Sequence, residues 1–256
     1  MAQTATSSRL TTGRGSSGQL RGAAGPYDPR TMTWKEWIRT VAIEPSLYAA
    51  DFARLGEQID VLLDAGVRVF HFDVGDGHFV EPVTIGPVVL RSIAPRVHER
   101  GGVLDCHLMV DNPTRHFPQI AAAVGDSATF HYEVVEDVAA TIAEARAHGL
   151  QAGVAFNPES EPEDVARAAG SADLVLCMSI HPGYSGQKFM PEAVDRIVRL
   201  RAELPAHVPI QVDGGIDEET IAGAREAGAS LFVAGSAIFG SNDPASAYRR
   251  LAHAVA

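Results

Sequence analysis

Cysteine is nearly absent from this sequence. Cys106 and Cys177 are its only two thiols, and each falls inside an apolar run. Disulfides belong to oxidising compartments, whereas isolated cysteines in apolar runs are typical of buried free thiols. We therefore predict two free thiols in a reducing compartment, which favours the cytoplasm.

Lysine is equally rare, since Lys35 and Lys188 are the only two. An aldolase that works through a Schiff base needs a lysine in its active site. Neither lysine ends one of the apolar runs described below, which argues against that class of enzyme. Trapping of a Schiff base by borohydride in the presence of substrate would be needed to support such an aldolase.

Long apolar runs and an excess of positive charge are also missing. No stretch approaches the roughly 18 apolar residues of a membrane span. With 21 basic and 32 acidic residues the formal net charge is -11, which argues against nucleic acid and against an anionic membrane surface as partners. An anionic small molecule would have to be held by local donors.

The first 40 residues differ in composition from the rest. Residues 1–30 are rich in Ser, Thr, Gly and Ala and contain three arginines before the first acidic residue, Asp28. This composition cannot build a core, so we predict a disordered tail, although an organelle transit peptide has a similar character. Residues 31–40 place Trp34 and Ile38 at helical spacing, which predicts a short capping helix.

From residue 41 onward, short runs rich in Val, Ile, Phe and Leu alternate with amphipathic stretches. The runs are apolar throughout, as in parallel strands covered on both sides. Eight such units in about 215 residues predict a single α/β domain, a (β/α)8 TIM barrel over residues 41–256, with a doubly wound open sheet as the alternative. The expected strands lie at about 41–46, 67–73, 102–108, 127–132, 150–156, 173–180, 208–213 and 230–234.

Polar residues end three of these strands, at the mouth where barrel enzymes place their active sites. His71 and Asp73 lie two apart, so both side chains point to the same face. His107 ends the next strand in "LDCHLM", and Asp213 ends the seventh in "IQVDGG". Two imidazoles and two carboxylates form a mixed set that suits Zn²⁺, Fe²⁺, Mn²⁺ or Co²⁺ better than Mg²⁺ or Ca²⁺.

Each of these residues alone has a simpler explanation. A single histidine at a strand end is usually a hydrogen-bonded core or rim residue, and an aspartate before a glycine, as in Asp76-Gly77, is common in turns. Four such residues at one mouth favour a metal site instead. Asp105 could orient an imidazole, while Met109 and Met178 would ordinarily fill the core.

Glycine-rich loops follow the last three expected strands. They are "HPGYSGQ" at 181–187, "DGG" at 213–215 and "AGSAIFG" at 234–240. Loops at this position, with a short helix that begins near Ser236, supply backbone N–H groups for a phosphate. One such loop could be a simple tight turn, but three adjacent loops favour phosphate binding through uncharged donors.

The sequence resembles the ribulose-phosphate 3-epimerase family from about Val41 to Gly240. The resemblance lies in "PSLYAADFARLG", "FHFDVGDGHFV", "LDCHLMV", "HPGYSGQKF", "VDGGI" and "VAGSAIFG". These runs are specific together, although none would suffice alone. They imply a metal-dependent isomerase of the pentose phosphate pathway that interconverts D-ribulose 5-phosphate and D-xylulose 5-phosphate.

The resemblance also implies roles for individual residues. His71, Asp73, His107 and Asp213 would hold one divalent ion, with Zn, Fe, Mn or Co as candidates. Asp73 and Asp213 would in addition be the two catalytic acid/base groups. The residues that would contact the substrate or its phosphate are Ser46, His107, Met109, Met178, Gly183, Tyr184, Ser185, Gly186, Gly214, Gly215, Gly235 and Ser236.

The implied chemistry agrees with the residue types. Inverting C3 of a 2-ketose requires removal of the proton α to the carbonyl from one face and delivery of a proton to the other, so two carboxylates are needed. A divalent ion can stabilise the enediolate charge as a Lewis acid. Holding the distant phosphate keeps the sugar in place while the reacting carbon flattens.

Departures from the family pattern leave the substrate open. Gly75 stands where the family usually has a methionine, and residues 81–84 and 181–187 are altered. A 3-epimerase of another ketose phosphate, of the allulose 6-phosphate type, is therefore an alternative. A metal-dependent phosphosugar lyase or hydrolase and a non-catalytic sugar-phosphate-binding barrel are rivals from other classes. We expect a small ketose phosphate as ligand and allow for a homo-oligomer.

Overall fold

The computed structural model describes residues 42–256. The predicted tail at 1–30 and the predicted capping helix at 31–40 lie outside the described residues. The boundary expected at residue 41 also remains a prediction, because the first described strand begins one residue later.

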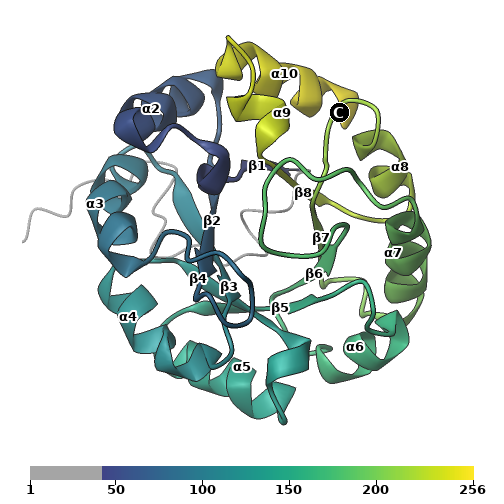
Figure 1. Cartoon of the computed structure of the whole chain (residues 1–256). Helices are drawn as coiled ribbons and strands as arrows, with labels where there is room; N and C mark the ends of the chain where they lie inside the picture. Colours follow the sequence, from purple (N-terminus) through teal and green to yellow (C-terminus); the bar gives the residue numbers. More distant parts are fainter. Residues whose placement is uncertain (1–41) are drawn as a thin grey trace, which may run out of the picture.

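Eight strands form one parallel sheet at the centre of the molecule (Figure 1). The sheet has the order β1-β8-β7-β6-β5-β4-β3-β2, and a parallel bridge between Ser46 and His71 joins β1 to β2. This closes the sheet into the predicted barrel and rules out the doubly wound alternative. The strands are β1 Ala42–Pro45, β2 Val69–Gly75, β3 Val103–Met109, β4 Ser127–His131, β5 Gln151–Phe156, β6 Leu174–Met178, β7 Ile210–Asp213 and β8 Leu231–Ala234.

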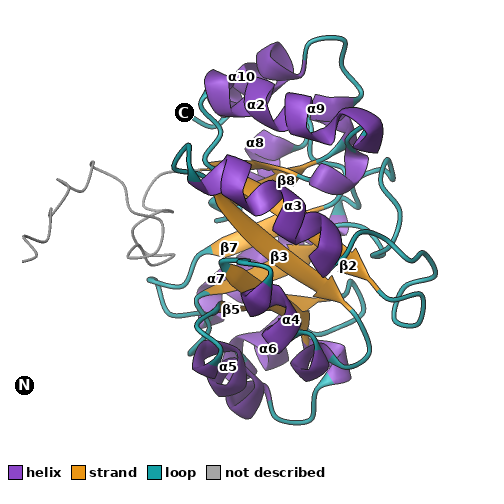
Figure 2. Ribbon diagram, turned by 90° about the vertical axis from the view of Figure 1, so that its left-hand side faces the viewer, coloured by secondary structure: helices purple, strands orange, loops and turns teal. Residues whose placement is uncertain are grey.

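Helices surround the strands as an outer layer, seen end-on in Figure 1 and from the side in Figure 2. Among the described residues, none of these helices combines the length and apolar character that crossing a membrane requires. The α-helices are α2 Leu55–Ala65, α3 Pro87–His98, α4 Phe117–Ala122, α5 Val138–Ala147, α6 Pro162–Ala168, α7 Glu192–Glu203, α8 Ile221–Glu226, α9 Ser236–Phe239 and α10 Pro244–Ala254. Short 3-10 turns are η1 Leu47–Ala49, η2 Phe52–Arg54, η3 Pro113–Arg115 and η4 Tyr132–Val134.

Local sequence explains several helix ends. Asp137 and Asp243 precede α5 and α10, and their side chains accept hydrogen bonds from the N–H groups of Ala140 and Ser246. These contacts satisfy N–H groups that have no partner within the helix. Helix α2 ends at Gly66, which has φ 108°, a conformation that glycine adopts without steric cost.

Alternation along the strands separates an outer core from the barrel interior. Phe70 and Phe72 of β2 point outward and are fully buried in the large core between strands and helices. Val69 belongs to a second, inner cluster with residues of β3, β6 and β8. His71 and Asp73 share the parity of Val69, so β2 directs both into the barrel interior.

Candidate active site

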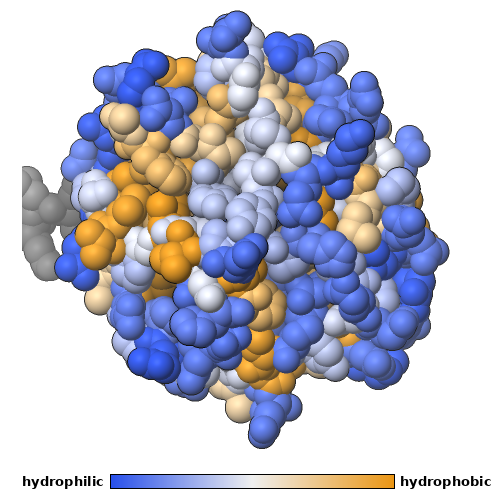
Figure 3. All heavy atoms as spheres, in the orientation of Figure 1, coloured by the Kyte–Doolittle hydropathy of each residue, from blue (hydrophilic) through white to orange (hydrophobic). Residues whose placement is uncertain are grey.

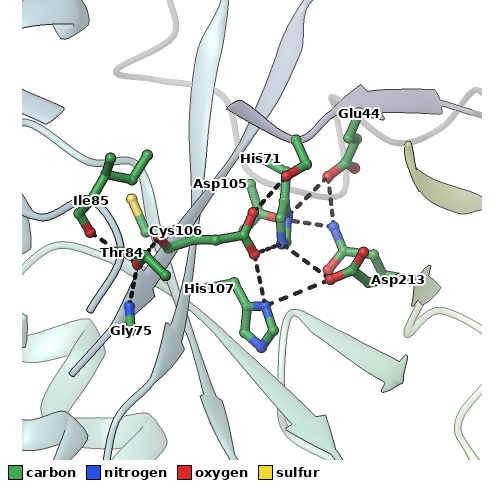
Figure 4. Close-up of polar contacts among 12 residues, drawn as sticks. Glu44, His71, Gly75, Thr84, Ile85, Asp105, Cys106, His107 and Asp213 are labelled. Atoms are coloured by element: carbon green, nitrogen blue, oxygen red, sulfur yellow. Dashed lines mark hydrogen bonds and ion pairs between the residues drawn. The ribbon is translucent and has the colours of Figure 1, made fainter. Parts of the chain in front are cut away.

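Strands β2, β3 and β7 bring two imidazoles and two carboxylates together at their carboxyl ends. Asp73 Oδ1 lies 3.2 Å from His71 Nε2 and 3.3 Å from His107 Nδ1. Asp213 Oδ2 lies 4.0 Å and 3.9 Å from the same two nitrogens. One ligand atom from each of the four residues lies within 4.8 Å of the others, and Figure 4 shows the side chains of His71, His107 and Asp213 turned toward a common centre.

This arrangement fits a divalent cation. The Nε2 atom of His71 is buried, has no hydrogen-bond partner and faces the carboxylates of the cluster, where a cation could bind it. Leaving such a buried polar atom without a partner is costly, and a bound cation would remove the cost. The set of two nitrogens and two carboxylates matches a borderline metal such as zinc, iron, manganese or cobalt.

A buried polar layer lies beneath His71. Asp105 Oδ2 accepts from His71 Nδ1 at 3.0 Å, which leaves Nε2 to face the cluster. Gln211 Nε2 donates to Asp105 Oδ2 at 2.7 Å and to Glu44 Oε2 at 2.6 Å. Ser127 Oγ donates to the other oxygen of Asp105 at 2.6 Å. Asp105 is therefore fixed from three sides and orients the imidazole, as a carboxylate behind a metal-binding histidine usually does.

Hydrogen bonds from neighbouring segments also fix the two aspartates. Thr84 Oγ1 donates to the backbone oxygen of Asp73 at 2.7 Å and accepts from Gly75 N at 2.6 Å. Thr84 and Gly75 lie to one side of the cluster in Figure 4. Ser46 Oγ donates to Asp73 Oδ2 at 2.7 Å. Ser179 Oγ lies 2.8 Å from the backbone oxygen of Asp213. Hydrogen bonds thus hold the backbone of both aspartates in place.

The two aspartates have opposite electrostatic surroundings. Burial opposes ionisation of Asp73, but the imidazoles of His71 and His107 hold its pKa well below the ordinary value. Burial and the negative charge of Asp73 raise the pKa of Asp213 to about 7. Surroundings that push the pKa values of two carboxyl groups apart are typical of acid/base pairs.

A cavity of about 560 Å³ opens beside this cluster. Its walls combine the two aspartates with the loops that follow β6, β7 and β8. Of the residues predicted to contact substrate or phosphate, those that line the cavity are Ser46, Met109, Met178, Gly183, Tyr184, Ser185, Gly186, Gly214, Gly215, Gly235 and Ser236. His107, also predicted to contact the substrate, is fully buried and is not among the lining residues.

Two of the lining glycines are required by the close approach of neighbouring segments. Gly214 has φ 119°, and a Cβ atom there would lie 2.4 Å from Ile180 Cγ1. Gly215 has φ 64°, and its Cβ would lie 2.2 Å from the backbone nitrogen of Phe189. The turn after Asp213 therefore packs directly against the β6–α7 loop, which places the two glycine-rich segments on one wall.

Gly75 does not widen the cavity. A Cβ atom at this position would lie 2.9 Å from both Thr84 Cγ2 and Val80 Cγ2, and 3.0 Å from Pro82 O. Gly75 is also not a lining residue. Val80 and the altered segment at 81–84 occupy the space next to the glycine, so these two departures from the family pattern are parts of one local packing arrangement.

Several residues around the site were not predicted from the sequence. Tyr48, Lys188 and Thr220 line the cavity, and of these Tyr48 lies only two residues beyond Ser46. His131 ends β4 and contacts His107, although the sequence analysis did not single it out. Its place at a strand end, the same signal that identified His107, could have found it.

The mouth is largely polar at its centre, with apolar surface on the side where α2 and α3 lie (Figure 3). The large apolar residues exposed in the segments before and at the start of these helices are Phe52, Val83 and Val88. The fold and the site together define a class of protein: a (β/α)8 barrel whose candidate site, a histidine and carboxylate cluster beside a glycine-lined cavity, lies at the carboxyl ends of the strands.

Sequence comparison identifies the family within this class. Residues 42–239 match the Ribulose-phosphate 3 epimerase family. A ribulose-phosphate 3-epimerase of Candida glabrata is 39% identical over 215 residues, which cover 79% of this chain and 87% of that protein. The enzyme of that name from Escherichia coli is 40% identical over 209 residues, covering 80% and 92%. The chain belongs to the ribulose-phosphate 3-epimerase family and is an isomerase that acts on carbohydrates.

Solved structures show the same fold at low sequence identity. A 3-hexulose-6-phosphate synthase from Salmonella typhimurium superposes with a TM-score of 0.64 at 17% identity, covering 84% of this chain and 98% of that one. An orotidine 5'-phosphate decarboxylase from Pyrococcus horikoshii gives a TM-score of 0.62 at 16% identity, covering 83% and 98%. At these identities the likeness concerns the barrel alone.

Proposed function

We propose that the protein interconverts D-ribulose 5-phosphate and D-xylulose 5-phosphate by inverting C3. One observation carries the proposal: two carboxylates from separate walls of the barrel, Asp73 on β2 and Asp213 on β7, face one cavity beside three glycine-rich loops. Strands β8 and β1 separate β7 from β2 in the sheet, so the carboxylates approach the cavity from different directions.

In the proposed mechanism, one aspartate removes the C3 proton from one face of the sugar. The other aspartate delivers a proton to the opposite face of the planar carbon. In the reverse reaction the two carboxyl groups exchange these tasks, which requires that one be ionised when the other is protonated. A single carboxylate could exchange the proton with solvent but could not invert the centre.

His71, Asp73, His107 and Asp213 would hold a divalent cation at the centre of the cluster. When bound, the cation supplies Lewis-acid stabilisation of the negative charge that develops on the sugar oxygens. Asp105 keeps Nε2 of His71 free of a proton by accepting from Nδ1 at 3.0 Å. Ser46 holds the rotamer of Asp73, and its position on the cavity wall also allows contact with the substrate.

The glycine-rich loops would hold the phosphate. Gly183, Gly186, Gly214 and Gly215 all have positive φ and line the cavity, so their backbone N–H groups are available where side chains would block the approach. Fixing this end of the sugar would keep C3 between the two carboxylates.

The comparisons favour a pentulose phosphate over a larger sugar. The relatives at 39% and 40% identity are named ribulose-phosphate 3-epimerases. Of the departures that suggested an allulose 6-phosphate type of substrate, Gly75 packs against residues 80–84 and does not line the cavity, whereas residues 182–187 do line it. We also propose a cytoplasmic location, in agreement with the two buried free thiols; a relative from Oryza sativa is named a cytoplasmic isoform.

The decisive experiment observes hydrogen exchange and inversion at C3 directly. The Zn²⁺-, Mn²⁺-, Fe²⁺- or Co²⁺-loaded protein is incubated in D2O with ribulose 5-phosphate, xylulose 5-phosphate and allulose 6-phosphate, and the sugars are observed by NMR. We expect deuterium at C3 together with the new epimer for the two pentulose phosphates. Absence of C3 exchange with every sugar would refute the epimerase, and turnover of allulose 6-phosphate alone would change the substrate.

A further inference from the structure

His131 lies behind the candidate metal ligand His107, at the end of β4. Its side chain is fully buried, and its ring meets that of His107 edge to edge, with centroids 5.0 Å apart and planes inclined by 25°. The two Nε2 atoms are 2.8 Å apart, a hydrogen-bond distance. A contact of this kind requires a hydrogen on one nitrogen and a lone pair on the other.

The far side of His131 faces Glu133. His131 Nδ1 lies 3.3 Å from Glu133 Oε2, while Glu133 Oε1 accepts from Asn157 N at 2.7 Å and from the hydroxyl of Ser160. Burial opposes ionisation of Glu133, but the hydrogen bonds from His131 and Ser160 hold its pKa below the ordinary value. An ionised carboxylate only accepts hydrogen bonds, so Nδ1 of His131 carries the hydrogen.

The hydrogen on Nδ1 of His131 determines where the other hydrogens on the two rings lie. A neutral His131 with hydrogen on Nδ1 has a lone pair on Nε2, so Nε2 of His107 must be the donor between the rings. A neutral His107 with hydrogen on Nε2 has its lone pair on Nδ1. That atom faces Asp73 Oδ1 at 3.3 Å and Asp213 Oδ2 at 3.9 Å, so its lone pair points to where a bound cation would accept it. Without a cation, the contact with the ionised Asp73 carboxylate calls for a hydrogen on Nδ1, so this arrangement applies to the metal-loaded protein. The reverse arrangement would place an imidazolium where no solvent reaches, which is unfavourable.

We propose that His131 is a positioning residue that connects Glu133 to His107 and so holds the His107 ring with Nε2 as the donor to His131 and Nδ1 directed at the cation. The inference rests on the metal site of the proposed function. A carboxylate orients His71 as well, but without an intervening ring, because Nδ1 of His71 donates directly to Asp105. His107 reaches its carboxylate through a second imidazole.

Two substitutions separate this role from simple packing. His131→Phe keeps an aromatic ring beside Phe79, whose ring centroid is 4.5 Å away, but removes both hydrogen bonds. His131→Gln offers a carbonyl that can accept from His107 and an amide that can donate to Glu133. We expect His131→Phe to weaken Zn²⁺ binding about 10- to 100-fold, measured by competition with a chromophoric chelator, and His131→Gln to recover most of the loss.

A matched control is available at the opposite end of the barrel. His98, at the end of α3, contacts Asp126 with an Nε2 to Oδ2 distance of 2.8 Å, just before β4 begins. His98→Phe removes a histidine and carboxylate pair far from the mouth and should leave Zn²⁺ affinity unchanged. Melting curves of all three variants establish that each is folded.

A second measurement does not depend on substrate. Nitrogen-15 NMR of histidine-labelled, Zn²⁺-loaded parent protein should show His107 with its hydrogen on Nε2, and this signature should change in His131→Phe. Parent-like Zn²⁺ affinity in folded His131→Phe, equal losses in the Phe and Gln variants, or a hydrogen on Nδ1 of parent His107 would each overturn the proposal. Because neither readout uses a sugar, failure of the epimerase assay is distinguishable from failure of this inference.

Discussion

At the scale of single residues, the proposed inversion depends on having two carboxylates rather than one. Asp213→Asn should lower the rate of epimerisation by roughly 10²- to 10⁴-fold, the usual contribution of one general acid or base. Asp73 remains in the variant, so solvent exchange at C3 of one epimer without inversion is expected to survive. The measurement is C3 deuteration and epimer formation by NMR in D2O.

The control for this substitution is Asp137→Asn. Asp137 caps α5, where asparagine serves about as well, so this variant loses a carboxylate without loss of the cap. It should turn over at the parent rate. Near-normal epimerisation by a correctly folded Asp213→Asn protein would remove Asp213 from the mechanism.

The two thiols allow a second prediction at the scale of single residues. Both are free and buried, as expected from the sequence, and burial raises the pKa of the Cys177 thiol to about 11. At pH 8 only about one in a thousand Cys177 thiols would be ionised, and the thiolate is the form that reacts. Iodoacetamide should leave Cys177 unmodified in the native protein and label it after denaturation, as read by mass spectrometry. Rapid native labelling at Cys177 would contradict its placement in the core.

At the scale of elements, the turn after β7 is the most constrained segment around the site. Gly215→Ala should destabilise the protein by roughly 3 kcal/mol or more, because the new Cβ meets the backbone of Phe189 in addition to the strain of a positive φ. Gly66→Ala shares the positive φ but has no atom within 4 Å of the new Cβ, so it should cost only about 1 kcal/mol.

Urea denaturation of both variants measures the difference in their free energies of unfolding. Gly215→Ala should also impair turnover, because the same turn positions Asp213 and the backbone amides of the cavity wall. Equal destabilisation by the two substitutions would show that the turn tolerates movement away from the β6–α7 loop.

The positions of the elements were predictable from the sequence because each strand is a short apolar run bounded by polar or glycine-rich segments. The observed strands begin within two residues of the expected starts. The ends are less regular. Strand β2 continues past Asp73 to Gly75, which pairs with Met109 on β3, while β6 stops at Met178 rather than near residue 180. Strand pairing decides these ends, and it is not encoded in the local pattern.

The candidate site was predictable to the same limited extent. Parity and strand ends indicated His71, Asp73, His107 and Asp213, and the structure places their ligand atoms within 4.8 Å of one another. Asp105 was also expected as a residue that could orient an imidazole, and it contacts His71 Nδ1. The contacts behind Asp105 were not accessible in this way. Gln211 meets Glu44 across 167 positions of chain, and such pairs are settled by packing inside the closed barrel.

At the scale of the whole molecule, residues 42–256 already close the barrel. Strand β1 pairs with β8, the Ser46 to His71 bridge completes the ring, and α10 packs against α2 and β1. Residues 1–30 contain few large apolar side chains, namely Met1, Leu10, Leu20 and Tyr27. A protein that begins at residue 31 should therefore keep the melting temperature and epimerase rate of the full chain. Loss of solubility or of activity on truncation would assign residues 1–30 a role that their composition does not suggest.

The cation site should contribute to the stability of the whole barrel, because its ligands come from three strands. An ion that binds only the folded state at 100 times its Kd stabilises by about 2.7 kcal/mol, which for a chain of this size corresponds to roughly 5–10 °C in melting temperature. We expect Zn²⁺ or Co²⁺ to produce such a rise in chelator-treated protein. Mg²⁺ should produce a much smaller rise, because imidazole ligands do not suit it.

His107→Ala tests whether the rise comes from this site. Removing one imidazole leaves Asp73, Asp213 and His71, a set too weak to hold the ion at the same concentration, so the rise with Zn²⁺ should largely disappear. The exposed pair of His181 and Glu159, with Nδ1 to Oε1 at 3.1 Å, is another place where a histidine and a carboxylate could attract the ion. His181→Ala should therefore keep the full rise. If both variants kept it, the stabilising ion would bind elsewhere and the cluster at the strand ends would not be the metal site.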